Sequence, residues 1–307
     1  MNYASLEKLC RDIGAEYSLN EPLASHTSMK IGGACDILVH AGSEYMVQEI
    51  IALCKKENIP YFVLGKGSNV LVSDNGYHGC VILVGKFMSH IHVDTEKNTI
   101  FALAGASLKS VCMAALENGL TGLEFAYGIP GSVGGALFMN AGAYGGEMKD
   151  IVKSCRYIDE NGEFQEMNAD KMDLSYRHSF FTGKKCVIIS VTMELKKGDK
   201  TEIKAKMDEL MQRRRDKQPL EFPSCGSTFK RPEGYFAAAL IEECGLKGYT
   251  IGGAQVSEKH SGFVINRGGA SYEDVMALVQ HIKKTVREQK ALNWNAKCSF
   301  LNKSTYL

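Results

Sequence analysis

Two glycine-rich segments contain the residues best suited to binding an anionic ligand. The first, Gly65-Lys66-Gly67-Ser68-Asn69, follows a short apolar stretch, and the second places seven glycines in the nineteen positions from 128 to 146. An average composition of about 7% glycine would place one or two glycines there. Because glycine has no side chain, the backbone N–H groups around it can approach phosphate oxygens closely.

The second segment is the more specific of the two. Neither matches a P-loop or a dinucleotide fingerprint, and the first alone is more typical of a tight turn. Loop packing explains two or three glycines. Seven glycines, together with Ser132 and Asn140 in the same segment, indicate a backbone wrapped around a ligand. The residues of the two segments that could contact such a ligand are Gly65, Lys66, Gly67, Ser68, Asn69, Gly128, Pro130, Gly131, Ser132, Gly134, Gly135, Asn140, Ala141 and Gly142.

Three polar segments could also take part in chemistry, although each has a simpler explanation. Residues 213–217 (Arg-Arg-Arg-Asp-Lys) end a helical pattern, where cations interact favourably with the helix dipole. The alternative is a contact with a diphosphate, because arginine forks onto phosphate oxygens. Ser227 lies in a loop of small residues, without the G-x-S-x-G elbow of a hydrolase nucleophile. Tyr176-Arg177 is equally typical of an exposed polar turn.

Helices and short strands alternate around these segments. Ser43 begins a helical pattern that ends before Pro60, and Ser107 caps another that ends at Gly119. The apolar stretch Tyr61-Phe62-Val63-Leu64 predicts a strand that runs into the first glycine segment. Asn161-Gly162 predicts a hairpin turn within a strand-rich region from 150 to 195.

The second half of the chain is richer in helical patterns. They cover residues 201–217, about 235–244, and a segment from Ser271, which opens with a capping-box pattern. The change from strands to helices near residue 200 predicts a domain boundary there. At 307 residues the chain is longer than a single hydrophobic core usually supports, which predicts two or three domains.

Composition narrows the class of protein. Hydrophobic residues make up 45% of the chain, charged residues 23%, and the formal net charge is +1, without the basic excess of a nucleic-acid binder. The ten cysteines are scattered with no C-x-x-C pair, and the N-terminus does not resemble a secretory signal. No apolar run approaches the ~20 residues needed to cross a bilayer. We therefore expect a cytoplasmic enzyme with buried, reduced cysteines that contacts neither membrane nor nucleic acid, and we expect a monomer.

Taken together and in order, several segments resemble the UDP-N-acetylenolpyruvoylglucosamine reductase family. They are Ser28-Met29-Lys30-Ile31-Gly32-Gly33, residues 65–69, residues 128–145, Tyr176-Arg177, Lys217-Gln218-Pro219 and Cys225-Gly226-Ser227. The set extends from about residue 20 to 290. The short stretch between Phe181 and Gln218 resembles the form of the family that lacks an extra substrate-covering loop.

The resemblance implies an α+β fold in which one module binds the cofactor and a separate domain binds the substrate. A vanillyl-alcohol-oxidase/PCMH-type module of two subdomains, residues 1–85 and 86–200, would hold FAD non-covalently. A C-terminal α/β domain, residues 201–307, would bind the UDP-sugar, and its end would return to the active site. NADPH would reduce the flavin and leave, and the flavin N5 would then give hydride to the enolpyruvyl ether. The product would be UDP-N-acetylmuramate, a peptidoglycan precursor.

The resemblance also implies roles for single residues. Hydride addition builds an enolate-like anion next to the substrate carboxylate, and Arg177 matches the arginine that stabilises this charge. Ser227 matches the proton donor. Tyr176, Arg214, Lys217 and Gln218 match the substrate-binding set, and the residues of the two glycine segments named above match the set that binds the FAD cofactor.

One departure from the family lies near the C-terminus. The family has a segment resembling L-E-x-E-V-R whose second glutamate completes the active site. Here the sequence is Leu292-Asn293-Trp294-Asn295-Ala296-Lys297-Cys298-Ser299, with Lys297 at the position of the catalytic glutamate and Asn295 at that of the other acid. Because a lysine reverses the charge, we expect normal reduction of the flavin by NADPH, an impaired second half-reaction, and recovery in Lys297→Glu. The alternative is a shifted register in which another acid, with Glu288 the nearest upstream candidate, reaches the site. The wild type would then turn over well, and Lys297→Glu would do little or harm.

Two alternatives to this reductase remain at the level of the sequence. One is another FAD-dependent oxidoreductase of the same superfold, since fold alone does not determine function. The other is a catalytically weakened homologue that binds flavin or a UDP-sugar.

Overall fold

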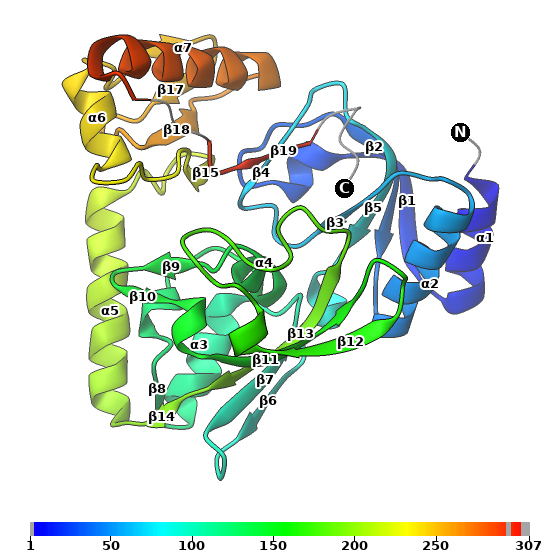
Figure 1. Ribbon diagram of the computed structural model, residues 1–307. Coiled ribbons are helices and arrows are strands. Elements are labelled where there is room, and N and C mark those ends of the chain that lie inside the picture. Colours follow the sequence, from blue (N-terminus) through cyan, green and yellow to red (C-terminus); the bar gives the residue numbers. More distant parts are fainter. Residues whose placement is uncertain (1–2, 293–295, 302–307) are drawn as a thin grey trace.

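The computed structural model describes residues 3–292 and 296–301 (Figure 1). Its N-terminal part is a four-stranded sheet of order β1-β2-β5-β3, in which β1 is antiparallel and the other neighbours are parallel. The strands are β1 (Glu16–Pro22), β2 (Ala34–His40), β3 (Tyr61–Leu64) and β5 (Tyr77–Leu83), and the helices are α1 (Ala4–Ile13) and α2 (Glu44–Lys56). The Ser43 side chain accepts a hydrogen bond from Met46 N, so the predicted cap is confirmed, as is the strand that begins at Tyr61.

A five-stranded antiparallel sheet of order β12-β11-β13-β7-β6 forms the second part. Its strands are β6 (Ile91–Asp94), β7 (Thr99–Leu103), β11 (Val152–Ile158), β12 (Phe164–Asn168) and β13 (Val187–Glu194), and its helices are α3 (Leu108–Glu117) and α4 (Val133–Phe138). Ser107 caps α3 through a bond from Ser110 N, and Gly119, with φ of 65°, follows its end. The turn at Asn161-Gly162 joins β11 to β12 as predicted.

Shorter elements complete these two parts. They are β4 (Val70–Val72), β8 (Leu120–Thr121), β9 (Gly142–Ala143), β10 (Gly146–Glu147) and β14 (Lys196–Lys197), with the 3-10 helices η1 (Leu23–His26), η2 (Lys86–Met88), η3 (Glu124–Ala126), η4 (Met148–Asp150) and η5 (Ala169–Lys171).

The long helix α5 (Lys200–Lys217) packs against the second part of the molecule. Its apolar residues Ile203 and Met207 are buried in the same hydrophobic core as α3 and β8. The amphipathic pattern predicts that one face is buried, but it does not show which part of the chain covers that face. We therefore propose that the domain boundary lies at the C-terminal end of α5 and not at residue 200.

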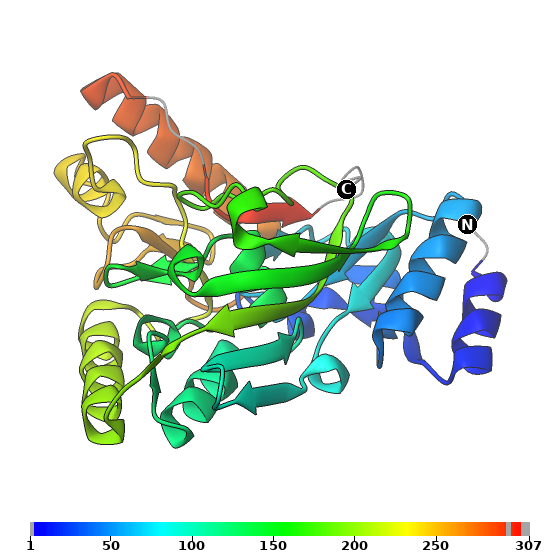
Figure 2. The same ribbon diagram turned by 60° about the horizontal axis from the view of Figure 1, so that its bottom comes forward.

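The C-terminal domain pairs two helices with a four-stranded antiparallel sheet of order β15-β18-β17-β16. Its elements are β15 (Ser224–Ser227), α6 (Ala237–Glu243), β16 (Thr250–Ile251), β17 (Ala254–Val256), β18 (Phe263–Asn266) and α7 (Tyr272–Lys290). Ser271 and Asp274 form the predicted capping box at the start of α7. Figure 2 shows this domain at one end of the molecule and α1 and α2 at the other.

The chain then returns from the C-terminal domain to the first sheet region. The last described strand, β19 (Ser299–Leu301), pairs in parallel with β4, and the two lie side by side in Figure 1. Met29, Ile31 and Leu71 of the N-terminal part also pack into the core of the C-terminal domain. The two regions are thus joined by α5, by β19 and by a shared hydrophobic core.

The cysteines behave as predicted from their spacing. All ten are free thiols, and only Cys186 is partly exposed. Among the helices built from described residues, none combines the length and apolar character that a membrane span requires.

Candidate active site

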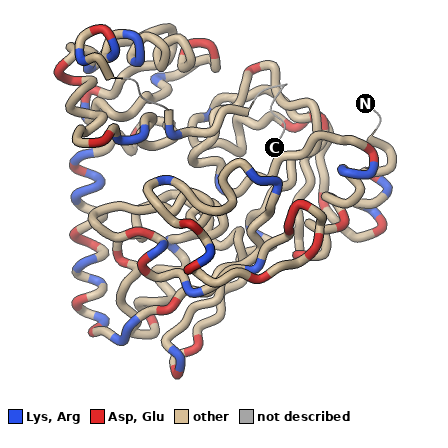
Figure 3. Tube along the Cα trace, in the orientation of Figure 1, with Lys and Arg blue, Asp and Glu red and all other residues tan. Residues whose placement is uncertain are grey.

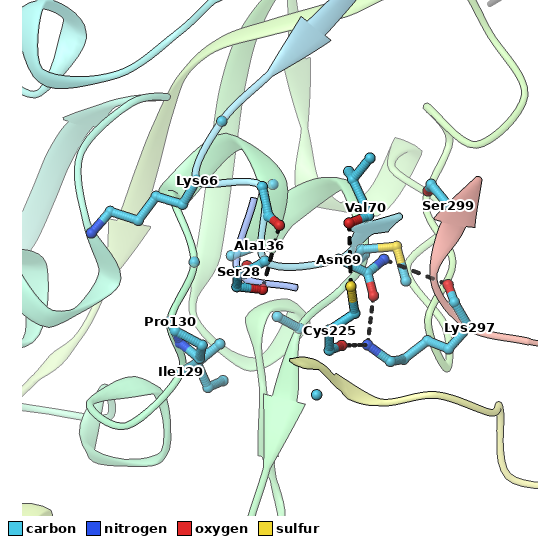
Figure 4. A pocket seen from close by; sticks show the side chains of 18 of the residues that line it. Ser28, Lys66, Asn69, Val70, Ile129, Pro130, Ala136, Cys225, Lys297 and Ser299 are labelled. Carbon is cyan, nitrogen blue, oxygen red and sulfur yellow. Dashed lines mark hydrogen bonds between the residues drawn. The ribbon is translucent and has the colours of Figure 1, made fainter. Parts of the chain in front are cut away.

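A cavity of about 1190 Å³ lies where the three parts of the molecule meet (Figure 4). Its lining comes from the 65–69 loop, the 128–144 segment, β13 and the loop before it, the end of α5, and β15 with the loops around it. Cavities for one small ligand usually measure about 300–1,000 Å³. This one is large enough for a cofactor and a substrate together.

The cavity wall is strongly basic. Its cationic side chains are Lys30, Lys66, Arg177, Lys184, Lys185, Arg214, Arg231 and Lys297, whereas Glu221 is the one carboxylate among the described lining residues. Figure 3 shows that basic residues gather at the end of α5 that meets the C-terminal domain, and of these Arg214 lines the cavity. A wall of one sign concentrates ligands of the opposite sign, so the cavity suits anionic ligands.

The 65–69 loop provides a set of backbone donors that the protein itself does not use. Among the described residues, none accepts a hydrogen bond from the backbone N–H groups of residues 65–69. Gly67 has a φ of 59°, and a Cβ atom there would lie 2.1 Å from His26 O, so only glycine fits. Free amides in a loop that follows a strand are an anion-binding arrangement. The 65–69 loop, which is the weaker of the two glycine segments as a sequence signal, therefore has a geometry well suited to binding an anion.

The 128–142 segment lines the cavity but owes many of its glycines to packing. A Cβ atom at Gly134 would lie 2.8 Å from Ala104 Cβ, and one at Gly142 would lie 2.7 Å from Glu147 Cβ. The two glycine segments touch, since a Cβ atom at Gly65 would lie 2.4 Å from Ser132 Oγ. The predicted residues that line the cavity here are Gly128, Pro130, Gly131, Ser132, Gly134, Gly135, Ala141 and Gly142.

Asn140 differs from the other predicted cofactor-binding residues, because it does not line the cavity and its side chain is bonded inside the protein. It is fully buried, donates to Glu147 Oε2 and Ser175 O, and accepts from Lys149 N. It is absent from the cavity lining. Its geometry fits a structural role in holding the loop that carries Arg177, whose guanidinium donates to Asn140 O.

Ser227 lies at the end of β15 and faces the cavity. It pairs with Phe263 of β18, and the preceding Gly226 has a φ of 69°. Its hydroxyl lies near the turn at Gly262, where a Cβ atom would be 3.3 Å from Ser227 Oγ and 3.2 Å from His260 Nδ1. The hydroxyl thus lies beside the backbone of Gly262, and Ser227 forms part of the cavity wall.

His260 is a neighbour of Ser227 that the sequence did not reveal. Its Nδ1 accepts a hydrogen bond from Gly262 N at 3.1 Å, which places the proton of the neutral ring on Nε2. Burial lowers the pKa of His260, so the neutral form is favoured.

Arg177 also lines the cavity. Its guanidinium donates to Gly142 O at 2.7 Å and to Asn140 O at 3.3 Å, and it has no carboxylate partner among the described residues. The neighbouring Tyr176 is 46% exposed, and its hydroxyl accepts a hydrogen bond from Arg231 N at 3.1 Å. This bond links the loop of the second part to the C-terminal domain at the cavity.

Lys297 lies in the same cavity as Ser227 and Arg177. Its ammonium donates to Asn69 Oδ1 at 2.6 Å and to Cys225 O at 3.3 Å, shown as dashed lines in Figure 4. Part of its side chain is exposed to the cavity, but the ammonium is surrounded by protein, and this burial lowers the pKa of Lys297. No described carboxylate pairs with it. Residues 293–295, including Asn295, lie outside the described part of the chain.

The basic end of α5 divides into residues that face the cavity and residues that do not. The side chain of Arg214 packs against Gly128, lines the cavity and has no carboxylate partner among the described residues, and burial lowers its pKa. Gln218 also lines the cavity, and its buried Oε1 has no hydrogen-bond partner among the residues that the structure describes. Lys217 is exposed and is not part of the lining, which does not support its predicted contact with the substrate.

These features fit FAD and a nucleotide substrate. The free amides of residues 65–69 suit a diphosphate, and the unpartnered Gln218 Oε1 and Tyr61 hydroxyl are buried polar atoms that a ligand would satisfy. The sequence did not single out Tyr61 or Arg231, because neither belongs to a recognisable motif.

Two family models match the chain. Residues 35–168 match an FAD binding domain, and residues 218–298 match the C-terminal domain of UDP-N-acetylenolpyruvoylglucosamine reductase. The second match begins directly after α5, in agreement with the boundary proposed above.

Sequence and structure relatives agree with these matches. UDP-N-acetylenolpyruvoylglucosamine reductases of Clostridium perfringens and Clostridium novyi are 52% and 51% identical, and each alignment covers 89% of this chain. The alignments cover 89% and 88% of those proteins. The crystal structure of UDP-N-acetylenolpyruvylglucosamine reductase (MurB) from Thermus caldophilus matches with a TM-score of 0.78 and 33% identity, over 94% of this chain and 98% of that one.

A more distant likeness confirms the expected fold class. An alkyldihydroxyacetonephosphate synthase matches 64% of this chain and 41% of its own with a TM-score of 0.50, at 16% identity, which concerns the fold alone. By its identity to relatives that match along almost their whole length, the chain belongs to the UDP-N-acetylenolpyruvoylglucosamine reductase family.

Proposed function

We propose that this chain reduces UDP-N-acetylglucosamine enolpyruvate to UDP-N-acetylmuramate with FAD and NADPH, in the synthesis of peptidoglycan precursors. The observation that carries the proposal is a single basic cavity in which Ser227, Arg177 and Lys297 lie beside the free amides of residues 65–69. Bound FAD supplies the acceptor and donor of hydride. The protein must bind and orient the substrate, stabilise the charge that forms, and deliver one proton.

Arg177 is suited to holding the carboxylate of the enolpyruvyl group. Its guanidinium is fixed by the carbonyl groups of Asn140 and Gly142, and no described carboxylate neutralises it. A guanidinium that is already positioned loses little entropy on binding a carboxylate, and it stabilises negative charge that spreads onto that group.

Ser227 is suited to protonating the adjacent carbon. A free serine hydroxyl is a weak acid, but a strongly basic carbanion requires only a proton held at the correct place. The β15–β18 pairing and the turn at Gly262 hold this hydroxyl at the cavity wall.

Lys297 supplies a second positive charge beside Ser227 and thus differs in role from the glutamate of the family pattern. Its two hydrogen-bond partners, Asn69 Oδ1 and Cys225 O, are both acceptors, so the ammonium fits its surroundings and a carboxylate would face oxygen atoms. A fixed cation here stabilises developing negative charge without giving up a proton.

The nucleotide end of the substrate is assigned to the side of the cavity formed by α5. Arg214 has no carboxylate partner in the described part of the chain and is suited to a diphosphate, and the Gln218 Oε1 atom can accept a hydrogen bond from a sugar or a base. Because NADPH and nucleotide-activated sugars are cytoplasmic metabolites, we place the enzyme in the cytoplasm, and we propose that it acts as a monomer.

Anaerobic titration tests the proposal. The purified protein should carry about one FAD per chain, NADPH should bleach its visible absorbance, and UDP-N-acetylglucosamine enolpyruvate should restore it. Restoration by a simple alcohol or hydroxy-acid system instead would indicate another oxidoreductase of the same fold. Binding of FAD without restoration by any enolpyruvyl substrate would indicate a non-catalytic homologue.

A further inference from the structure

The imidazole of His260 binds the peptide N–H of a residue that lies against Ser227. His260 Nδ1 accepts a hydrogen bond from Gly262 N at 3.1 Å, and a Cβ atom at Gly262 would lie 3.3 Å from Ser227 Oγ. Among the residues that the structure describes, no other group accepts a hydrogen bond from Gly262 N. The position of the backbone beside the Ser227 hydroxyl therefore depends on the histidine ring.

The turn that contains Gly262 is bonded on one flank to His260 and on the other to the strand that carries Ser227. Ser257 Oγ accepts a hydrogen bond from His260 N at 3.3 Å, which holds the backbone of the histidine. Thr228 N, next to Ser227 in the chain, donates to Gly262 O at 2.8 Å. A shift of Gly262 would therefore also displace the end of β15, where Ser227 lies.

The surroundings of the His260 ring favour its neutral form. Burial lowers the pKa of His260, and the carboxylate of Glu242 on α6 opposes this effect in part. That carboxylate accepts from Lys247 Nζ at 2.9 Å, and the ammonium of Lys259 donates to a carbonyl group at the end of α5. In the neutral ring Nδ1 can accept from Gly262 N, whereas protonation places a hydrogen on Nδ1 and removes the acceptor.

We propose that His260 is a positioning residue for the second half-reaction, in which its neutral imidazole fixes Gly262 and thereby holds the Ser227 hydroxyl where the substrate carbanion takes up a proton. The inference rests on the proposed function, because it requires Ser227 to be the proton donor. His260 gives up no proton itself, since its Nδ1 is occupied by Gly262 N. It acts through the geometry of the turn.

Two substitutions separate the acceptor from the ring. His260→Asn keeps a side-chain oxygen that can accept from Gly262 N, whereas His260→Ala removes the acceptor. A displacement of about 1 Å at a reacting group can cost about 10²-fold in rate, so His260→Ala should slow the half-reaction with the enolpyruvyl substrate by about 10- to 100-fold. His260→Asn should stay within about 3-fold of the wild type. Stopped-flow absorbance should show little change in the reduction of bound FAD by NADPH.

A double-mutant cycle tests whether His260 acts through Ser227. Adding His260→Ala to Ser227→Ala should slow the second half-reaction by less than about 2-fold further, because the hydroxyl that His260 positions is already absent. Additive effects of the two substitutions would overturn the inference. His281→Asn is the matched control, because His281 stacks on Tyr249 in the same domain and is not among the described lining residues, so this rate should be unchanged.

The pH profile is a readout that a purely structural role would not change. The wild-type rate of the second half-reaction should fall as pH drops through the lowered pKa of His260, below its ordinary 6.5, and NMR of isotope-labelled histidine measures this pKa without turnover. His260→Asn should lack this fall, and a fall at the same pH in His260→Asn would refute the inference. A wild type that NADPH reduces but that the enolpyruvyl substrate does not reoxidise would instead overturn the proposed function.

Discussion

Replacing Lys297 tests the charge distribution of the reaction centre most directly. In Lys297→Gln, the side-chain amide can still donate to Asn69 Oδ1 and Cys225 O, but the positive charge is gone. In Lys297→Met, both the charge and the two donors are gone. Comparing the two variants separates electrostatic stabilisation from simple support of the two loops.

The expected magnitude follows from the position of the ammonium. It lies 4.0 Å from the Cβ position of Gly226, next to Ser227, so the charge that develops beside Ser227 is close to it. At a separation of about 6 Å and an effective dielectric constant of about 20, two unit charges interact with about 2.8 kcal/mol. That energy corresponds to about 100-fold in rate, and stronger screening reduces it to about 10-fold.

We therefore expect both variants to slow the half-reaction with the enolpyruvyl substrate by about 10- to 100-fold. Reduction of bound FAD by NADPH should change little. Stopped-flow absorbance measures the two half-reactions separately. Because the pKa of Lys297 is lowered, the wild-type rate of the second half-reaction should fall as pH rises through this value, and Lys297→Gln should lack that step.

The sequence alone suggested that Lys297→Glu would restore activity. With two oxygen acceptors around the ammonium, we now expect glutamate to slow the second half-reaction further. A faster Lys297→Glu variant would refute the electrostatic role and support the original expectation. Slowing in Lys297→Met alone, with Lys297→Gln like the wild type, would show that the hydrogen bonds matter and the charge does not.

Three further substitutions test the other assignments. Ser227→Ala should leave FAD reduction nearly intact and slow the second half-reaction at least ~10²-fold, and equal slowing of both would indicate a structural role. Arg214→Ala should raise the KM for the UDP-sugar by about 10-fold or more. Lys217→Ala, on the exposed side of the same helix, should change this KM less than about 2-fold. Similar effects of the two substitutions would contradict the assignment of Arg214 to the cavity and of Lys217 to the outer surface. Burial lowers the pKa of His260 from 6.5, so protonation favours the unfolded chain and stability should fall as pH drops below that value. His260→Asn retains an acceptor for Gly262 N and should show a smaller drop in melting temperature between pH 7.5 and 5.5; an unchanged drop would exclude His260 as its source.

The elements of the fold were predictable where local chemistry determines them. Ser43, Ser107 and Ser271 cap their helices as expected, because a cap requires only a side-chain oxygen and nearby amides. The assignment of α5 to a domain was not predictable, because its pattern of mostly polar residues does not show which surface covers Ile203 and Met207.

The segments that form the candidate site were predictable from the sequence, but the positions of their amides and side chains were not. The sequence could not show that the amides of residues 65–69 are free while those of Val133 and Gly134 are bonded to Ala106 and Ala104. Nor could the sequence show that Arg214 faces the cavity while Lys217, three positions further along the same helix, does not. The Tyr61 hydroxyl became a candidate ligand contact only because the structure shows it buried without a hydrogen-bond partner among the described residues.

Because β19 pairs with β4, the position of the C-terminal domain and that of the 65–69 loop depend on each other. The C-terminal domain is attached by α5, by β19 and by the shared hydrophobic core, and Ser299 N donates to Asn69 O. A change in the position of this domain should therefore be transmitted to the 65–69 loop. A substrate that binds between the domain and the rest of the chain should then stabilise the amides that bind the diphosphate of FAD. Linkage requires the converse as well, so FAD retention should rise with substrate occupancy by the same factor as substrate affinity rises with FAD.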